Sequence, residues 1–556
     1  MKKHSFFKTS AGLVAFVLLI AQGTLAHAFS FHHGELKGSF DTDLTYGIAM
    51  RTEDADTDNM QAYGNRNFKD AGDIFSNAIR GSSTLALDYR NVGLLVRGNY
   101  FYDNAYDQEK LSKDGRDKLV TEGAITDAFV YGYFGDNDQV NIRLGKQVIS
   151  WGENTFIQGS INDINTVDFN KLRQPGSALK DAFIGTNAAY VSWNVNDEWT
   201  VETFYLFDFD PIELDPAGGF FTTLDGAGKG GGFDDAGNGV TGENIGPFGS
   251  PSGACVSHDN KHCGLVGGSL VQVGSKWAKG GQYGLAIRKF FPELFNGSEI
   301  AFYYQNLHDH VPMISTYYNT GQYFLDYVEN IERLGVSFNT NIEGWVIAGE
   351  YHVRKDVPIQ MTAPVLNGLG AGPFFGVNCG SCTEGDEIKG YELVDRHQMQ
   401  VTFQRIWGVG FMDADANSTL LEVAYGWVDG LPAKNEALIG PFRTVFNPQV
   451  TDNFWGFQVK QSLTYEAALF NVASVSPFVA FKYDVEGVSN EIVPLFVDDR
   501  KALTLGVNFG YGGGTWTGGL SWTMFDGSNS QINQAGSRLN GRTDRDFIQA
   551  NVSYSF

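Results

Sequence analysis

The aromatic and charged residues best suited to contact a small molecule lie in one stretch, 150–185, which shows neither strand alternation nor low complexity. Its aromatic and charged side chains include Trp151, Glu153, Asp163, Asp168, Phe169 and Arg173. Long ordered loops are often functional. We predict that this loop folds into the interior of the protein and constricts it, with Trp151 and Phe169 as an apolar patch beside Glu153 and Arg173. The alternative is an outward loop packed on its neighbours.

Two groups of polar residues resemble reactive sites but lack the partners that such chemistry needs. Asp163, Asn165 and Asp168 offer oxygen ligands at short spacing, as Ca²⁺ prefers, yet the glycine turn and terminal glutamate of a calcium loop are absent. The His-Asp-His segment 308–310, with Ser315 nearby, has no fixed scaffold or evident nucleophile–base pair. No nucleotide motif is present. We therefore expect no enzymatic activity, no metal and no cofactor.

The four cysteines form two local pairs, Cys255 with Cys263 and Cys379 with Cys382. In an exported protein, such spacing predicts two short-range disulfides that pin loops. The Cys-Gly-Ser-Cys segment 379–382 is also compatible with redox activity or zinc binding, but a redox fold or a second ligand pair is needed and neither is visible.

The elements that must position these loops are strands. In Phe547–Phe556 apolar residues occupy every second position, and Leu36–Met50 repeats the pattern at the other end of the chain. A period of two indicates a strand with one apolar and one polar face, and about ten tilted residues cross the hydrocarbon of a bilayer. Two such terminal strands can pair and close a sheet, which satisfies every backbone group in lipid. We predict an all-β fold, a transmembrane antiparallel β-barrel.

Alternating segments follow one another along the whole chain and predict about 18 strands, an even number as expected for bacterial barrels. Sixteen or twenty strands are the alternatives. They are Leu36–Met50, Thr84–Arg90, Val92–Tyr102, Thr126–Phe134, Gln139–Ile149, Thr186–Trp193, Trp199–Phe207, Tyr283–Arg288, Ser298–Asn306, Ile331–Asn339, Trp345–Arg354, Gln398–Arg405, Thr419–Val428, Phe454–Tyr465, Phe478–Val485, Ala502–Gly510, Trp516–Phe525 and Phe547–Phe556. Connections then alternate between short periplasmic turns and long extracellular loops, and both cysteine pairs fall in the long loops. Leu270–Trp277 would break the alternation, so we assign it to a long loop, as a hairpin arm.

Residues 1–28 have the features of a secretory signal peptide. Lysines open the chain, Leu13–Ala21 is a short apolar run, and Ala-His-Ala at 26–28 is a small-x-small cleavage site. The run is too short to span a membrane as a helix. We expect cleavage after residue 28, leaving 29–556 as a single outer-membrane β-barrel domain; an uncleaved anchor is the alternative.

Composition and charge narrow the function classes. The formal net charge of −24 argues against nucleic acid as a partner, because phosphates require a basic surface. The 68 glycines, the aromatic content of 14% and only 15 prolines suit long strands, tight turns and interfacial aromatic girdles. A large soluble β-sandwich or propeller would also alternate, but no propeller-type repeat is found.

Polar positions of the strands should face the lumen, because charges on the lipid face cost about 2–4 kcal/mol at the midplane. Glu350, His352 and Arg354 alternate with apolar residues in one strand, and Gln400 does so in the next. We predict that these four side chains face the lumen. Eighteen strands enclose a space wide enough for water, which is a pore unless loops block it.

Several sequence blocks resemble the outer-membrane family catalogued as domain of unknown function 1302. They are Leu-Gly-Lys-Gln-Val-Ile-Ser-Trp-Gly-Glu at 144–153, whose Trp-Gly-Glu at 151–153 is the most specific part, together with Asn165, Asp168 and the segments 171–176, 38–42, 335–340 and 544–547. The resemblance implies an outer-membrane β-barrel and suggests passage of lipophilic small molecules. It implies no particular binding residues.

Our leading hypothesis is an outer-membrane channel for passive passage of hydrophobic or aromatic small molecules. The alternative is a non-conducting structural or adhesion barrel that binds partners through its outer loops. The expected partners are outer-membrane lipid and lipopolysaccharide, a small hydrophobic solute, and the barrel-assembly machinery acting on the C-terminal strand. The sequence leaves the solute, the direction of transport and the oligomeric state open.

Overall fold

The computed structural model describes residues 29–556 except 57–64, 66, 108–110, 112, 223–270, 362–380, 432–449, 492–493 and 529–538. The predicted signal peptide and three of the four cysteines, Cys255, Cys263 and Cys379, lie outside the described residues. Within them the chain is mostly strand, as the period-two pattern predicts.

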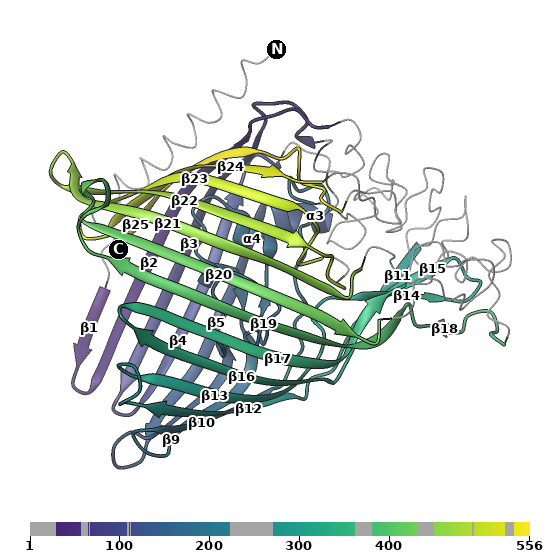
Figure 1. The fold of residues 1–556 in the computed structure, drawn as a ribbon, viewed down its shortest axis with the longest axis horizontal. Coiled ribbons are helices and arrows are strands. Elements are labelled where there is room, and N and C mark those ends of the chain that lie inside the picture. The colour runs from purple at the N-terminus through teal and green to yellow at the C-terminus, as the bar shows by residue number, and fades with distance from the viewer. Residues whose placement is uncertain are drawn as a thin grey trace.

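Nineteen strands form one antiparallel sheet, and eighteen of them close into a barrel, as predicted (Figure 1). The eighteen are β2 (Leu36–Arg51), β3 (Ile74–Tyr89), β4 (Val92–Asp103), β5 (Thr121–Phe134), β6 (Val140–Gln147), β9 (Thr186–Asn194), β10 (Trp199–Leu206), β12 (Gln282–Phe291), β13 (Ser298–Leu307), β16 (Ile331–Ile342), β17 (Trp345–Gln360), β19 (Tyr391–Trp407), β20 (Ala416–Asp429), β21 (Asn453–Leu469), β22 (Ala473–Glu486), β23 (Arg500–Tyr511), β24 (Trp516–Asp526) and β25 (Phe547–Ser555).

The barrel closes where the two ends of the chain meet. β2 pairs with β25 from Asp43↔Ser555 to Arg51↔Phe547. The backbone N–H of Thr42 donates to the carbonyl of Phe556 at 2.7 Å, which extends the pairing to the last residue. The remaining edge of β2 is covered by an additional strand, β1 (Phe29–His33), which pairs with the start of β2. The sequence pattern does not predict β1; it completes the edge that β25 is too short to cover.

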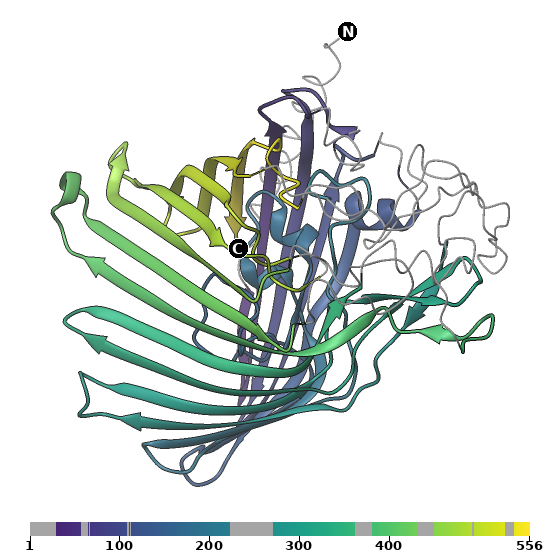
Figure 2. The same ribbon diagram turned by 45° about the vertical axis from the view of Figure 1, so that its right-hand side comes forward.

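The connections differ in length at the two ends of the barrel, as predicted. Short turns join the hairpins at one end, and long segments gather at the other (Figures 1 and 2). Four short strands among the long segments form a second sheet: β11 (Val271–Lys276), β15 (Gln322–Asp326), β14 (Met313–Tyr317) and β18 (Glu387–Ile388). β11 pairs parallel with β15, so the piece predicted as a hairpin arm lies outside the barrel wall but is not half of a hairpin.

Helices are short and lie in the connections. In the described part of the chain they are α3 (Lys113–Leu119), α4 (Phe169–Arg173), α5 (Leu179–Ala182) and the 3₁₀ turn η4 (Phe411–Asp413). β7 (Thr166–Val167), which precedes α4, pairs with β8 (Phe183–Ile184), which follows α5. Among the described residues, none of the helices has the length and apolar character needed to span a bilayer.

The strands have one apolar face outside and one polar face inside. Phe302, Leu334 and Met399 are 61%, 48% and 46% exposed on the outer surface. Gln398 and Gln400, which flank Met399 in β19, are 0% and 2% exposed. This arrangement is the reverse of that in a soluble protein. A barrel in lipid requires it, because apolar side chains contact the acyl chains and polar ones line the interior.

Candidate functional site

The connection between β6 and β9 runs through the interior of the barrel, as its contacts with the wall show. Its backbone between residues 153 and 161 is bonded by side chains from β13, β16, β17, β19 and β20. We call residues 148–185 the inner loop. Because its polar backbone is buried away from water, each of these contacts satisfies a group that would otherwise cost free energy.

Glu422 on β20 holds the first turn of the inner loop. Its carboxylate accepts the backbone N–H groups of Thr155 at 2.8 Å, Phe156 at 2.6 Å and Ile157 at 2.7 Å. The hydroxyl of Thr402 donates to the same carboxylate at 3.1 Å. Glu422 is 0% exposed, so these charge-assisted bonds are what compensates its burial.

Glu350 on β17 holds the loop at a second point. Its two oxygens accept the backbone N–H groups of Glu153 at 2.8 Å and Ile161 at 2.9 Å. A Cβ on Gly152 would lie 2.5 Å from the Glu350 carboxylate, and the residue has φ +85°. Glycine is therefore required at 152 by both the space and the backbone conformation.

Further wall side chains bind carbonyl groups of the loop. The guanidinium of Arg333 donates to the carbonyl of Ser160 at 2.7 Å, and Gln305 Nε2 donates to that of Ile161 at 3.0 Å. Gln398 Nε2 donates to the carbonyl of Gln158 at 3.1 Å and to Gln400 Oε1 at 3.0 Å. The loop is thus fixed through both its donors and its acceptors.

An ion-pair group lies where the loop turns back. Asp163 Oδ2 is 3.0 Å from Arg354 Nη2 and 3.8 Å from Arg333 Nη2. Burial alone would raise the pKa of Asp163, but Arg354 and then Arg333 lower it below its usual range. Asp309 nearby accepts the backbone N–H of Val311 at 2.9 Å, and burial raises its pKa to about 6.

The structure separates the apolar patch predicted for the loop. Trp151 is 1% exposed and packs into the wall, with ring centroids 4.8 Å from Phe204 and 5.9 Å from Tyr303. Glu153 accepts a hydrogen bond from Asn339 at 3.0 Å, and burial raises its pKa. Neither residue lines the cavity described below. A tryptophan next to the wall buries its large apolar surface there, because the wall offers Phe204 and Tyr303 to pack against.

The second half of the loop is built around α4. Asp168 is its N-cap and accepts the N–H of Lys171 at 3.1 Å. Lys171 and Lys118 both contact Glu122 on β5, at 3.3 and 2.7 Å, which ties the helix to the wall. At the end of the helix, Arg173 stacks over Phe169 with 5.6 Å from its guanidinium carbon to the ring centroid.

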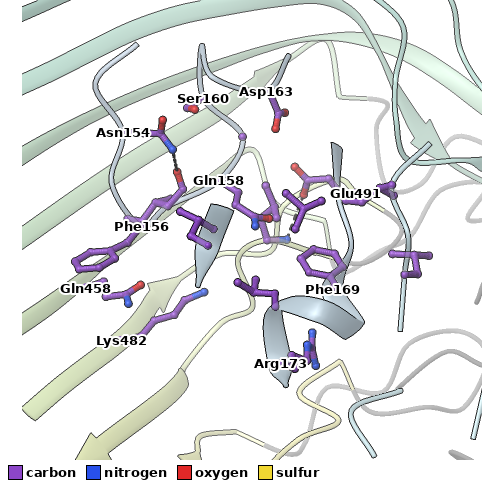
Figure 3. A pocket seen from close by; sticks show the side chains of 18 of the residues that line it. Asn154, Phe156, Gln158, Ser160, Asp163, Phe169, Arg173, Gln458, Lys482 and Glu491 are labelled. Carbon is purple, nitrogen blue, oxygen red and sulfur yellow. Dashed lines mark hydrogen bonds between the residues drawn. The ribbon is translucent and has the colours of Figure 1, made fainter. Parts of the chain in front are cut away.

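A cavity of about 1010 Å³ lies between the inner loop and the wall strands β21 to β24 (Figure 3). Phe156, Gln158 and Asp163 line it from the first half of the loop, and Phe169 and Arg173 from α4. Gln458 and Lys482 point into it from β21 and β22. The arrangement can admit a small molecule that presents both apolar and polar groups.

The ten loop and wall residues singled out from the sequence therefore divide into two groups. Asp163, Phe169, Arg173 and Arg354 line the cavity. The other six do not line it and belong to the contacts between the loop and the wall or within the loop: Trp151, Glu153, Asp168, Glu350, His352 and Gln400. Sequence reasoning missed Glu422 and Lys482, although both occupy polar positions of predicted alternating strands and were open to the same argument as Glu350.

The groups considered for metal binding or hydrolysis are engaged elsewhere. Asn165 exchanges bonds with the backbone of Ile149, and Asp168 caps α4, so the two do not join Asp163 around an ion. His310 Nδ1 contacts the carbonyl of Asp210 at 2.8 Å, and Ser315 lies in the small sheet. Over the described ranges, no cluster of three or more metal-ligating side chains occurs.

Residues 9–556 match the family described as "Protein of unknown function (DUF1302)", which confirms the resemblance found in the sequence. No curated protein sequence matches the chain. Solved structures that are similar include Pseudomonas aeruginosa OpdK with vanillate, at 10% identity, covering 93% of this chain and 98% of that one, with a TM-score of 0.41. A BenF-like porin from Pseudomonas fluorescens Pf-5, at 8% identity and the same coverage of 93% and 98%, has a TM-score of 0.45. Acinetobacter baumannii OccAB4, at 9% identity, again with 93% and 98% coverage, gives 0.41.

Proposed function

Because the chain belongs to the DUF1302 family and its strands close into a barrel with an apolar outer face, we propose that it is an outer-membrane channel for passive passage of small molecules. The observation that carries this proposal is the lumen, which the inner loop narrows without filling, since a cavity of about 1010 Å³ remains. A barrel built only as a support could fill its interior with side chains, as small barrels do.

The lining of the cavity supports hydrophobic or aromatic solutes. Phenylalanine residues line it from the inner loop (Phe156 and Phe169), from the connection after β10 (Phe221) and from the wall strand β22 (Phe478). Rings in a lumen offer apolar contact area to a solute, and hydrophobic residues with a few polar groups are typical of ligand pockets. We propose that such solutes pass down their concentration gradient.

The apolar outer surface of the barrel supports an outer-membrane location. Phe302, Leu334 and Met399 represent an outer face that is suited to acyl chains and unsuited to water. Export through residues 1–28, insertion aided by the assembly machinery at β25, and contact with lipopolysaccharide belong to this proposal. So do the disulfides Cys255–Cys263 and Cys379–Cys382.

The proposal is tested with purified protein in planar lipid bilayers. We expect stepwise ion conductance from the wild type and a larger unit conductance after deletion of residues 160–174, which removes the part of the loop that crosses the lumen. Removal of the exposed β23–β24 turn residues 513–514 is the matched control and should leave the conductance unchanged. If neither the wild type nor the loop deletion conducts, while both are folded, the protein is not a channel.

The small sheet of β11, β14, β15 and β18 favours a second function, a barrel that binds partners through its outer loops. This ordered sheet lies beyond the barrel rim and offers a defined surface to a partner. Trp277, which directly follows β11, is 56% exposed there. Liposome swelling separates the two functions, because only a channel admits solute.

A further inference from the structure

The cavity has the opposite charge balance to the whole chain. The sequence contains 40 Lys and Arg against 64 Asp and Glu. Of the residues that the structure describes, eight Lys or Arg and five Asp or Glu line the cavity. One of the eight, Lys501, pairs with Asp499 at 2.7 Å, and the basic residues remain in the majority without it. Positive side chains in a cleft with low-dielectric walls concentrate anions.

The basic excess gathers where α4 faces β22, β23 and the turn before β25. We call this group the cation cluster: Arg173, Lys482, Arg500 and Arg542. Asp215 forms ion pairs with two of them, at 3.0 Å from Arg173 and 4.0 Å from Arg542. Asp484 pairs with the other two: it accepts a hydrogen bond from Arg500 Nε at 2.7 Å and lies 3.5 Å from the Lys482 ammonium. Two carboxylates therefore face four cations.

The cations of the cluster oppose one another. Burial lowers the pKa of Arg173, and although Asp215 counteracts this, the charge of Arg500 lowers it further. Burial also lowers the pKa of Arg542, and Arg173 adds to the effect. Among the described residues, Nη1 of Arg173 has no hydrogen-bond partner. A negative group between these side chains would relieve the repulsion between the cations and accept a hydrogen bond from Arg173 Nη1.

Aromatic rings lie directly beside the cluster. The guanidinium of Arg173 is 4.8 Å from the ring centroid of Phe221 and 5.6 Å from that of Phe169. Phe478 and Phe525 line the same cavity. A ligand with its charge at the cluster would therefore place its remaining atoms against apolar surface.

We propose that the cation cluster binds the carboxylate of an amphipathic anion, whose apolar body lies against Phe169 and Phe221. The inference rests on the proposed channel function, because it names the class of solute that the lumen selects. A planar carboxylate matches the two-pronged donor geometry of Arg173 and Arg542, and the rings select against a fully hydrated inorganic anion. The site thus gives the channel a preference for organic acids over neutral molecules of the same shape.

Binding is measured first in detergent, by isothermal titration calorimetry, so that it does not depend on conduction. The probe is cyclohexanecarboxylate, and cyclohexanecarboxamide is its neutral isostere. We expect the acid to bind at least about 10-fold more tightly than the amide, because each charge-assisted hydrogen bond lost weakens binding by about that factor. The variants Arg173→Gln and Lys482→Gln should each lose about 10-fold in affinity for the acid alone. The control Arg90→Gln removes the same charge from an exposed turn and should bind normally.

The inference is overturned if the acid and the amide bind equally, if neither binds, if inorganic phosphate competes as well as the organic acid, or if the cluster variants bind like Arg90→Gln. Folding of each variant is checked by heat-modifiable gel mobility, and Lys482→Gln carries the test if Arg173→Gln does not fold. In bilayers, the wild type should prefer chloride over potassium, and both cluster variants should reduce that preference. A wild type that binds the acid but does not conduct contradicts the channel and leaves the anion site in place.

Discussion

The carboxylate of Glu422 lies 2.7 Å from the backbone nitrogen of Ile157, although 265 residues separate the two in the sequence. A wall strand thereby fixes the conformation of a loop that crosses the lumen. Glu350 does the same for Ile161, at 2.9 Å. The position of the loop in the lumen is therefore fixed by two buried carboxylates of the wall.

Glu422→Gln should loosen the inner loop. The amide keeps one acceptor oxygen and turns an NH₂ group toward backbone donors, so at least one of the three N–H bonds is lost. Hydrogen bonds to a charged group contribute about 1.5–3 kcal/mol, and the free energy of unfolding should fall by about that amount. In bilayers the mean conductance and its fluctuations should rise. Glu198→Gln, on an exposed turn, is the control, and equal behaviour of the two variants would show that Glu422 does not hold the loop.

Asp309 predicts a pH dependence of selectivity. Burial raises its pKa to about 6, so it is ionised at pH 8 and takes up a proton as the pH falls through 6. Because it lines the cavity, the loss of its negative charge should increase anion preference between pH 7 and pH 5. Reversal potentials in a salt gradient measure this change. In Asp309→Asn the component centred near pH 6 should be missing; a variant that titrates like the wild type would assign the change to other groups.

Arg51 stabilises the seam of the barrel. It is 0% exposed, donates to Asn65 at 3.0 Å and to the carbonyl of Phe68 at 2.5 Å, and lies 3.6 Å from Asp544 in the segment before β25. Breaking a buried ion pair by removing one partner costs about 3–5 kcal/mol. Arg51→Ala should therefore lower the temperature at which the folded barrel loses its faster gel mobility. Arg90→Ala should not, because that side chain is exposed. Equal midpoints for the two variants would place the stability of the seam elsewhere.

The cysteines should all be oxidised in the exported protein. Mass spectrometry of the protein alkylated without reduction should show no modified thiol, and proteolytic peptides should link Cys255 to Cys263 and Cys379 to Cys382. A different pairing, or free thiols in protein isolated from the outer membrane, would contradict the prediction that these pairs pin loops.

The wall of the barrel is predictable from the sequence because its physics is local. One apolar and one polar face force a period of two, and the eighteen strands and their closure follow from it. The pattern fails where apolar and polar residues do not alternate. β3 begins at Ile74 rather than at the predicted Thr84, and its first residues, Ile-Phe-Ser-Asn-Ala-Ile-Arg, place apolar and polar side chains on both faces. The hydroxyl of Ser76 and the backbone N–H of Asn77 donate to Asp103 there, a long-range contact that the local pattern does not indicate.

The site is less predictable because its contacts join distant parts of the chain. The sequence predicts that the loop enters the lumen, because the stretch is long and shows neither strand alternation nor low complexity, and the structure places it there. The sequence does not predict its partners, since nothing local to Glu422 or Lys482 indicates which loop they meet. The position of Trp151 differs from the prediction for a related reason: a pattern shows that a residue is apolar but not which of two neighbouring surfaces covers it.

Solute uptake by proteoliposomes tests the central claim most directly. Liposomes containing the wild type should swell faster in an isosmotic solution of a small aromatic solute than protein-free liposomes do. Liposomes containing the protein without residues 160–174 should swell faster still and admit larger solutes. If both proteins are folded and inserted and neither swells faster than lipid alone, the barrel does not conduct solutes, and the proposed channel function is wrong.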